Sequence, residues 1–118
     1  MNRKVICKLL LIFSALGFGV LSNAEPIWID VRSVSEYNED HIDGDTFIPH
    51  EQIVQQVSEL FPDKSSEIHL YCRSGGRAGR ALNALEEAGY TNVFNAGGID
   101  DAREQRDLDG QEWKLNLD

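Results

Sequence analysis

The chain has few cysteines and few basic residues, and each shortage excludes a class of protein. With only 2 Cys in 118 residues, it cannot form a disulfide framework or a zinc site of four cysteines. Its 11 Lys and Arg against 20 Asp and Glu give a net charge of -9, the opposite of the basic surface of a general nucleic-acid binder. Hydrophobic residues make up 42%, which is too low for a polytopic membrane protein. We therefore expect one globular domain.

The first 24 residues have the pattern of a secretory signal peptide. They open with three basic residues, Arg3, Lys4 and Lys8. An apolar run from Leu9 to Leu21 follows, and small residues end the segment at Ala24. This run has 13 residues and is interrupted only by Ser14. A helix of that length rises about 20 Å, short of the roughly 30 Å hydrocarbon core, which argues against a membrane anchor. We expect residues 1–24 to be cleaved and residues 25–118 to form a periplasmic or secreted domain with no stable membrane insertion.

The processed chain would hold a single cysteine. It would have 94 residues with all 20 acids and 8 of the 11 bases, which gives a net charge of -12. Cys7 would leave with the signal peptide, so only Cys72 would remain. A lone thiol in an oxidising compartment cannot form an internal disulfide. It is buried and inert, paired between chains, or chemically used.

Alternating strand and helix patterns predict an α/β domain with a small, mostly parallel sheet flanked by helices. The strand patterns are residues 27–31, 46–48, 68–71 and 93–94. The helical patterns are residues 33–40, 53–61, 78–88 and, less regularly, 99–106. The first of them opens with Ser33 and Glu36 in the spacing of a capping box. After a turn at Asp109-Gly110, apolar residues alternate at Trp113, Leu115 and Leu117, which suggests an edge strand or a packed tail.

Cys72 stands between a predicted strand and a predicted helix. In open α/β sheets, ligands bind beyond the carboxyl ends of the strands. Residues 73–77 contain no proline and therefore offer five backbone N–H groups. Gly75 and Gly76 can take a positive φ, which would turn these groups inward. Together with the positive end of the helix dipole, such a cradle lowers the pKa of a thiol and binds an anion.

The distribution of charge also distinguishes this region. No acid occurs in the 18 positions from Ile68 to Leu85, and the window holds three arginines, Arg73, Arg77 and Arg80. Because a Debye length of roughly 8 Å screens the acidic remainder of the chain, these arginines should decide anion binding at contact distance. A cysteine taken alone is commonly a buried structural residue. The combination of strand end, glycines and acid-free window predicts instead that Cys72 is reactive.

Four segments resemble, in the same order, the motifs of the rhodanese-like sulfurtransferase family. They are residues 30–33 with Glu36-Tyr37, residues 41–44 with 48–50, residues 71–78, and residues 89–90 and 92–93 with 97–99. The resemblance spans residues 27–99, nearly the whole predicted domain. It is greatest with the exported, single-domain members of the phage-shock type.

The resemblance implies a sheet of about five strands and a sulfur transfer at Cys72. The sulfane sulfur of a small anionic donor such as thiosulfate would pass through a Cys72 persulfide to a thiol or cyanide acceptor, without metal or organic cofactor. The implied substrate-binding residues are Arg73, Ser74, Gly75, Gly76 and Arg77. Arg73 is expected to face the pocket mouth and bind the sulfonate. Arg77 either contacts the anion or pairs with Asp30, and the sequence leaves both open.

Two other functions remain open. A cysteine phosphatase also binds an anion at a strand–loop–helix turn, but it needs an arginine six positions after the cysteine, where this chain has Ala78 and carries Arg77 one position early. A non-catalytic rhodanese-like domain would carry sulfur or bind a partner without turnover. The spacing of the three histidines, His41, His50 and His69, suggests no metal site.

Overall fold

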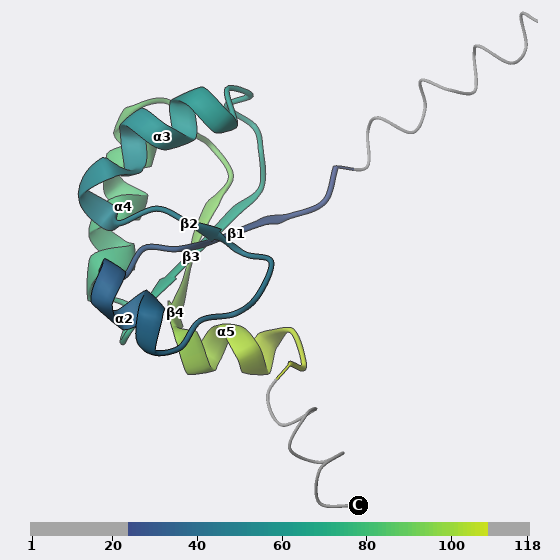
Figure 1. The fold of residues 1–118 in the computed structure, drawn as a ribbon. Coiled ribbons are helices and arrows are strands. Elements are labelled where there is room, and N and C mark those ends of the chain that lie inside the picture. Colours follow the sequence, from purple (N-terminus) through teal and green to yellow (C-terminus); the bar gives the residue numbers. More distant parts are fainter. Residues whose placement is uncertain (1–23, 109–118) are drawn as a thin grey trace, which may run out of the picture.

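The computed structural model describes residues 24–108 (Figure 1). Its strands are β1 (Ile27–Asp30), β2 (Thr46–Phe47), β3 (Ile68–Cys72) and β4 (Val93–Gly98). Its helices are α2 (Val34–Glu39), α3 (Ile53–Leu60), α4 (Gly76–Glu87) and α5 (Ile99–Gln105), with a 3-10 turn, η2 (His50–Gln52), before α3. No helix within this range is long and apolar enough to cross a membrane.

The strands form one parallel sheet in the order β2-β1-β3-β4, which confirms the predicted α/β class. Residues 24–108 contribute four strands, one fewer than the number implied by the family resemblance. The expectation for the last strand was wrong in length, because β4 continues to Gly98 and pairs there with Cys72. The predicted turn and tail at residues 109–118 lie outside the described residues.

Helices cover the two faces of the sheet, with α3 and α4 on one side and α5 on the other (Figure 1). Successive strand residues point to opposite faces. Accordingly, Leu70 and Cys72 belong to the core cluster beneath α3 and α4, whereas Tyr71 packs with Ile99 and Ala102 of α5. The alternation along β3 therefore sets the thiol on the α4 side of the sheet.

β1 and β3 are neighbours in the sheet, and the chain adds the next strand on opposite sides of this pair. From β1 the chain crosses through α2 to β2 on one edge, and from β3 it crosses through α4 to β4 on the other. In parallel α/β sheets, ligands bind in the crevice at such a switch point. The topology thus places the beginnings of α2 and α4 next to each other at the carboxyl edge of the sheet.

The beginning of α2 is fixed by the predicted capping box. Ser33 Oγ accepts a hydrogen bond from Glu36 N at 3.2 Å, and Glu36 Oε1 accepts one from Ser33 N at 3.0 Å. Because α2 has no buried residue, these caps and the ion pairs of its side chains hold it in place more than core packing does.

Candidate active site

Cys72 is the last residue of β3, and its side chain is 1% exposed. It is a free thiol at the start of the loop that leads into α4. The backbone N–H of Gly75 donates a hydrogen bond to Sγ at 3.0 Å. The thiol therefore lies under the first turn of α4, where backbone N–H groups converge.

The pKa of Cys72 lies below its ordinary value because two opposing effects do not cancel. Burial raises the pKa by disfavouring the thiolate. Backbone N–H groups lower it by more in total, and they come from Ala78, Gly75, Ser74 and Arg77. The cradle was predicted from residues 73–77, and the donors that act on the sulfur extend one residue further, to Ala78. The arrangement can stabilise negative charge on sulfur without a neighbouring base.

Only one of the two loop glycines uses the conformational freedom expected of both. Gly75 is the N-cap of α4 and has φ +102°. Gly76 is the first residue of α4, and its φ is not positive. The expectation for Gly76 was therefore wrong, because the helix begins two residues earlier than the pattern at Ala78 suggested. The turn that aims N–H groups at Cys72 depends on Gly75 alone.

Strand β4, the neighbour of β3 in the sheet, comes close to the backbone of the loop that follows Cys72. Gly98 pairs with Cys72, and a Cβ at Gly98 would overlap the carbonyl oxygen of Arg73. A residue without a side chain is therefore needed there, whatever its φ. This close approach fixes the start of the loop against the sheet.

The guanidinium of Arg77 pairs with Glu36 and not with Asp30. Arg77 Nη1 donates to Glu36 Oε1 at 2.7 Å and Nη2 donates to Oε2 at 3.0 Å. Asp30 is instead occupied by Arg32, whose Nε and Nη2 donate to it at 2.9 and 2.8 Å. The possible Arg77–Asp30 pair is thus excluded, because Arg32, two residues along the chain, already binds both carboxylate oxygens of Asp30. Arg77 connects α4 to α2 across the switch point.

The other two arginines of the acid-free window point into solvent. The side chain of Arg73 is 77% exposed, and its Nη1 is 3.8 Å from Glu36 Oε2. Arg80 is exposed, further along α4. Arg73 thus lies at the rim of the site, where it can reach an incoming anion, and Arg80 lies beyond it.

A pocket of about 250 Å³ opens beside the loop. It is lined by Arg32, Glu36, Glu39, Asp40, Arg73, Ile99 and Asp100. Two larger hollows, of about 400 and 590 Å³, lie around Glu25 and Ile27 and include no residue of the cysteine loop. Size alone therefore does not identify the site, and we assign it to the pocket that the loop borders.

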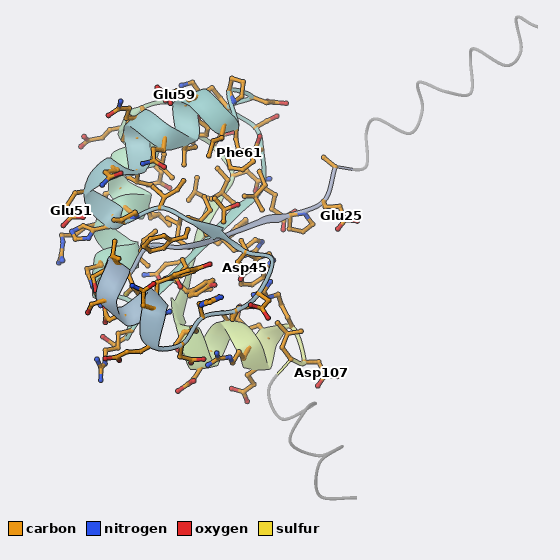
Figure 2. The ribbon with its side chains drawn as sticks, in the orientation of Figure 1. Glu25, Asp45, Glu51, Glu59, Phe61 and Asp107 are labelled. Carbon is orange, nitrogen blue, oxygen red and sulfur yellow. The ribbon has the colours of Figure 1, made fainter. Side chains whose placement is uncertain are left out.

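Behind the thiol, a polar cluster supports Tyr71 on the opposite face of the sheet. Its hydroxyl donates to Asp45 Oδ2 at 2.7 Å, and Arg106 donates to both carboxylate oxygens of Asp45 at 3.0 and 2.6 Å. Asp45, labelled in Figure 2, thus connects the segment before β2 to the end of α5. Burial and the hydrogen bond to Asp45 raise the pKa of Tyr71, so its phenol stays protonated.

Sequence reasoning missed two residues of this site. The sequence indicated Glu36 as a helix cap and as part of a family-like motif, but not as the partner of Arg77. Asn95 was read as following a short strand, and no local pattern connects it to Gly75, to whose carbonyl oxygen it donates a hydrogen bond. Within residues 24–108, no three His, Cys, Asp or Glu side chains gather closely enough to hold a metal ion.

Comparison with known proteins gives this arrangement a family. The rhodanese-like domain matches residues 20–105. Thiosulfate sulfurtransferase PspE of Escherichia coli K12 is 37% identical over 101 residues, which cover 86% of this chain and 92% of that protein. The chain belongs to the rhodanese-like family. The sequence resemblance to that family is therefore confirmed.

Two further comparisons show the range of this rhodanese-like fold. A solved structure described as a rhodanese with anions from E. coli has a TM-score of 0.62 and 38% identity, and the match covers 65% of this chain and 91% of that one. A putative sulfur carrier protein of Bacillus subtilis, YrkF, is 33% identical over 67 residues, which cover 57% of this chain and 35% of that protein. Membership of the rhodanese-like family thus supports sulfurtransferase chemistry in general terms.

Proposed function

We propose that the chain is a thiosulfate sulfurtransferase in which Cys72 carries the sulfur. The observation that carries the proposal is the buried Sγ of Cys72, held 3.0 Å from the N–H of Gly75 with a lowered pKa. A persulfide at this position would place its negative outer sulfur among the same N–H groups. The similarity to a named thiosulfate sulfurtransferase supports the choice of donor.

The proposed reaction consists of two displacements at sulfur. The Cys72 thiolate attacks the outer sulfur of thiosulfate, a new S–S bond forms, and the old S–S bond breaks with its electron pair leaving on sulfite. The acceptor, a thiolate or cyanide, then attacks the outer sulfur of the persulfide. This step releases an acceptor persulfide or thiocyanate and returns Cys72 as thiolate. No net oxidation occurs, so no metal or organic cofactor takes part.

The loop residues take separate parts in this proposal. The backbone of Ser74, Gly75 and Arg77 stabilises charge on sulfur, and Gly76 begins the helix that carries these groups. Arg73, at the rim, binds the sulfonate end of the donor. A phosphatase is disfavoured because Arg77 is held by Glu36 through two hydrogen bonds and is therefore not directed at an anion over Cys72.

Mass spectrometry after mixing the protein with thiosulfate tests the proposal. We expect a gain of one sulfur atom, assigned to Cys72 by peptide mapping because the full chain also contains Cys7. Cys72→Ser should gain none and retain the wild-type circular dichroism spectrum. Loading followed by thiocyanate release with cyanide indicates an enzyme, whereas loading without release indicates the sulfur carrier. Hydrolysis of a phosphate monoester without sulfur loading would overturn both.

We also infer that the protein acts outside the cytoplasm, after removal of residues 1–24. The basic start, short apolar run and small residues of that segment support export, and residues 1–23 lie outside the described structure. The protein recovered from the periplasm or medium should have the intact mass of residues 25–118, with Glu25 as its first residue. Recovery of the full chain from the cytoplasm would contradict this inference.

A further inference from the structure

The charge of Arg77 is cancelled within the site. Its guanidinium and the carboxylate of Glu36 meet in a two-point contact of 2.7 and 3.0 Å, with the side chains 25% and 18% exposed. Such fork-to-fork pairs have defined geometry and low mobility. An anion bound at Cys72 therefore encounters a neutral pair, although the sequence had left open a direct contact between Arg77 and the anion.

Glu36 is itself held so that it cannot turn away from Arg77. Its Oε1 accepts hydrogen bonds from Ser33 N at 3.0 Å and from Ser33 Oγ at 2.9 Å. The hydrogen bonds from Arg77 and Ser33 hold its pKa well below the ordinary carboxyl value. Glu36 therefore carries its negative charge throughout the physiological pH range.

The pocket lined by Glu36 contains little other positive charge. Arg32 is paired with Asp30. The Nη1 of Arg73 lies 3.8 Å from Glu36 Oε2. Glu39 and Asp100 line the same pocket and are negative. Arg73, which is 77% exposed, is thus the main positive charge available to a bound donor.

We propose that Glu36 determines which sulfur donors the site accepts, by cancelling the charge of Arg77 and so disfavouring dianionic donors relative to donors with one negative charge. The inference rests on the proposed sulfur transfer and concerns the same pocket. Thiosulfate is a dianion and an organic thiosulfonate is a monoanion, although both present a terminal sulfur for attack. The ratio of kcat/KM for the thiosulfonate to kcat/KM for thiosulfate should exceed the ratio of their rates with a free thiol in solution.

Glu36→Gln tests the proposal because the amide removes the charge and keeps one oxygen, which can still accept hydrogen bonds from Ser33 and from one Arg77 nitrogen. Its NH2 group cannot accept the second hydrogen bond from Arg77. We compare kcat/KM for thiosulfate with kcat/KM for benzenethiosulfonate. The ratio should rise about threefold or more in Glu36→Gln, as expected when one partly buried charge is removed near a dianion. The increase should shrink at high salt. Glu36→Asp keeps the charge and should keep the wild-type ratio, even if both rates fall.

Glu87→Gln is the matched control, since it removes the same charge from an exposed position of α4 that neither lines the pocket nor makes an ion pair among residues 24–108. Its ratio should change by less than about twofold. If Glu36→Gln lowers kcat/KM equally for both donors, Glu36 only positions the loop and the proposal is wrong. If Glu87→Gln changes the ratio as much as Glu36→Gln, a diffuse field is responsible and the specific assignment is also wrong.

An alkylation measurement separates failure of this inference from failure of the proposed function. The rate ratio of iodoacetate, an anion, to iodoacetamide, which is neutral, is measured at Cys72 by peptide mapping and needs no sulfur transfer. This ratio should also rise about threefold in Glu36→Gln. A wild-type protein that no donor loads would refute the sulfurtransferase. An unchanged alkylation ratio would refute the role of Glu36.

Discussion

Asn95 binds the carbonyl oxygen of Gly75 through its Nδ2 at 3.0 Å, and so connects β4 to the turn of the cysteine loop. The Oδ1 of Asn95 accepts a hydrogen bond from Gly97 N at 2.9 Å, which fixes the orientation of the amide. Both partners of Asn95 are glycines with positive φ, at +102° and +94°. One side chain thus stabilises two unusual backbone conformations on either side of the site.

Replacing Asn95 by alanine should damage the site more than it damages the fold. Each of the two lost hydrogen bonds contributes about 0.5–1.5 kcal/mol to the unfolding free energy, and the turn at Gly75 also loses its tether. We expect persulfide formation from thiosulfate to slow several-fold. Asn92→Ala is the control, because Asn92 donates a single bond to Ser65 O, remote from the loop. Equal loss of activity in both variants would show that Asn95 has no particular role at the loop.

Gly75→Ala should destabilise the protein, whereas Gly76→Ala should not. A Cβ at Gly75 is strained by φ +102° and meets the Cα of Gly97 at 3.4 Å, so we expect a loss of about 1–2 kcal/mol and reduced activity. A Cβ at Gly76 meets nothing within 4 Å, and alanine favours helix, so that variant should be neutral or slightly stabilised. Urea unfolding and the cyanide assay measure both. Similar destabilisation of the two variants would contradict the turn described here.

Arg73→Ala should raise the KM for thiosulfate more than Arg80→Ala does. Because Arg73 is 77% exposed, solvent screens its contact with the sulfonate, and about 0.5–1 kcal/mol corresponds to a two- to fivefold effect. The defect should lie in KM if ground state and transition state bind the sulfonate equally. Steady-state kinetics at two ionic strengths is the measurement. If the two variants behave alike, Arg73 has no specific contact with the donor.

The lowered pKa of Cys72 predicts the pH dependence of its reactivity. Alkylation by iodoacetamide, followed at Cys72, should reach half its maximal rate below the value of about 8.5 that free cysteine shows. Since the folded state binds the proton less tightly than the unfolded state, folding should also gain stability as pH rises toward that unfolded value. The protein unfolded in urea is the control and should titrate normally. A native midpoint at or above the unfolded one would refute the cradle.

The sequence predicted the local part of the site well. The order of strands and helices, the capping box at Ser33 and the place of Cys72 at a strand end all follow from patterns a few residues long. The choice between Gly75 and Gly76 did not, because it depends on where α4 begins. That start was predicted two residues late, since Gly76 and Arg77 carry no apolar signal.

Contacts between distant segments could not be predicted. Glu36 and Arg77 are 41 positions apart, and the sequence left Arg77 open between an anion contact and a pair with Asp30. The pairing of Asp30 with Arg32 depends on the bend of the chain after β1, which brings two residues of opposite charge into a two-point contact. Any nearby carboxylate could pair with an arginine, and the order of the strands decides which carboxylate is near.

By itself the sequence determined the fold class and the family, and it predicted a reactive cysteine beneath a glycine turn. These properties depend on hydrophobic period, capping residues and the conformational freedom of glycine, all of which act over a few residues. Only the tertiary structure decided the charge around that cysteine. The window from Ile68 to Leu85 contains no acid, yet the parallel crossover from β1 places Glu36 against Arg77. Electrostatic interaction depends on distance in space, and the order of strands in the sheet sets that distance.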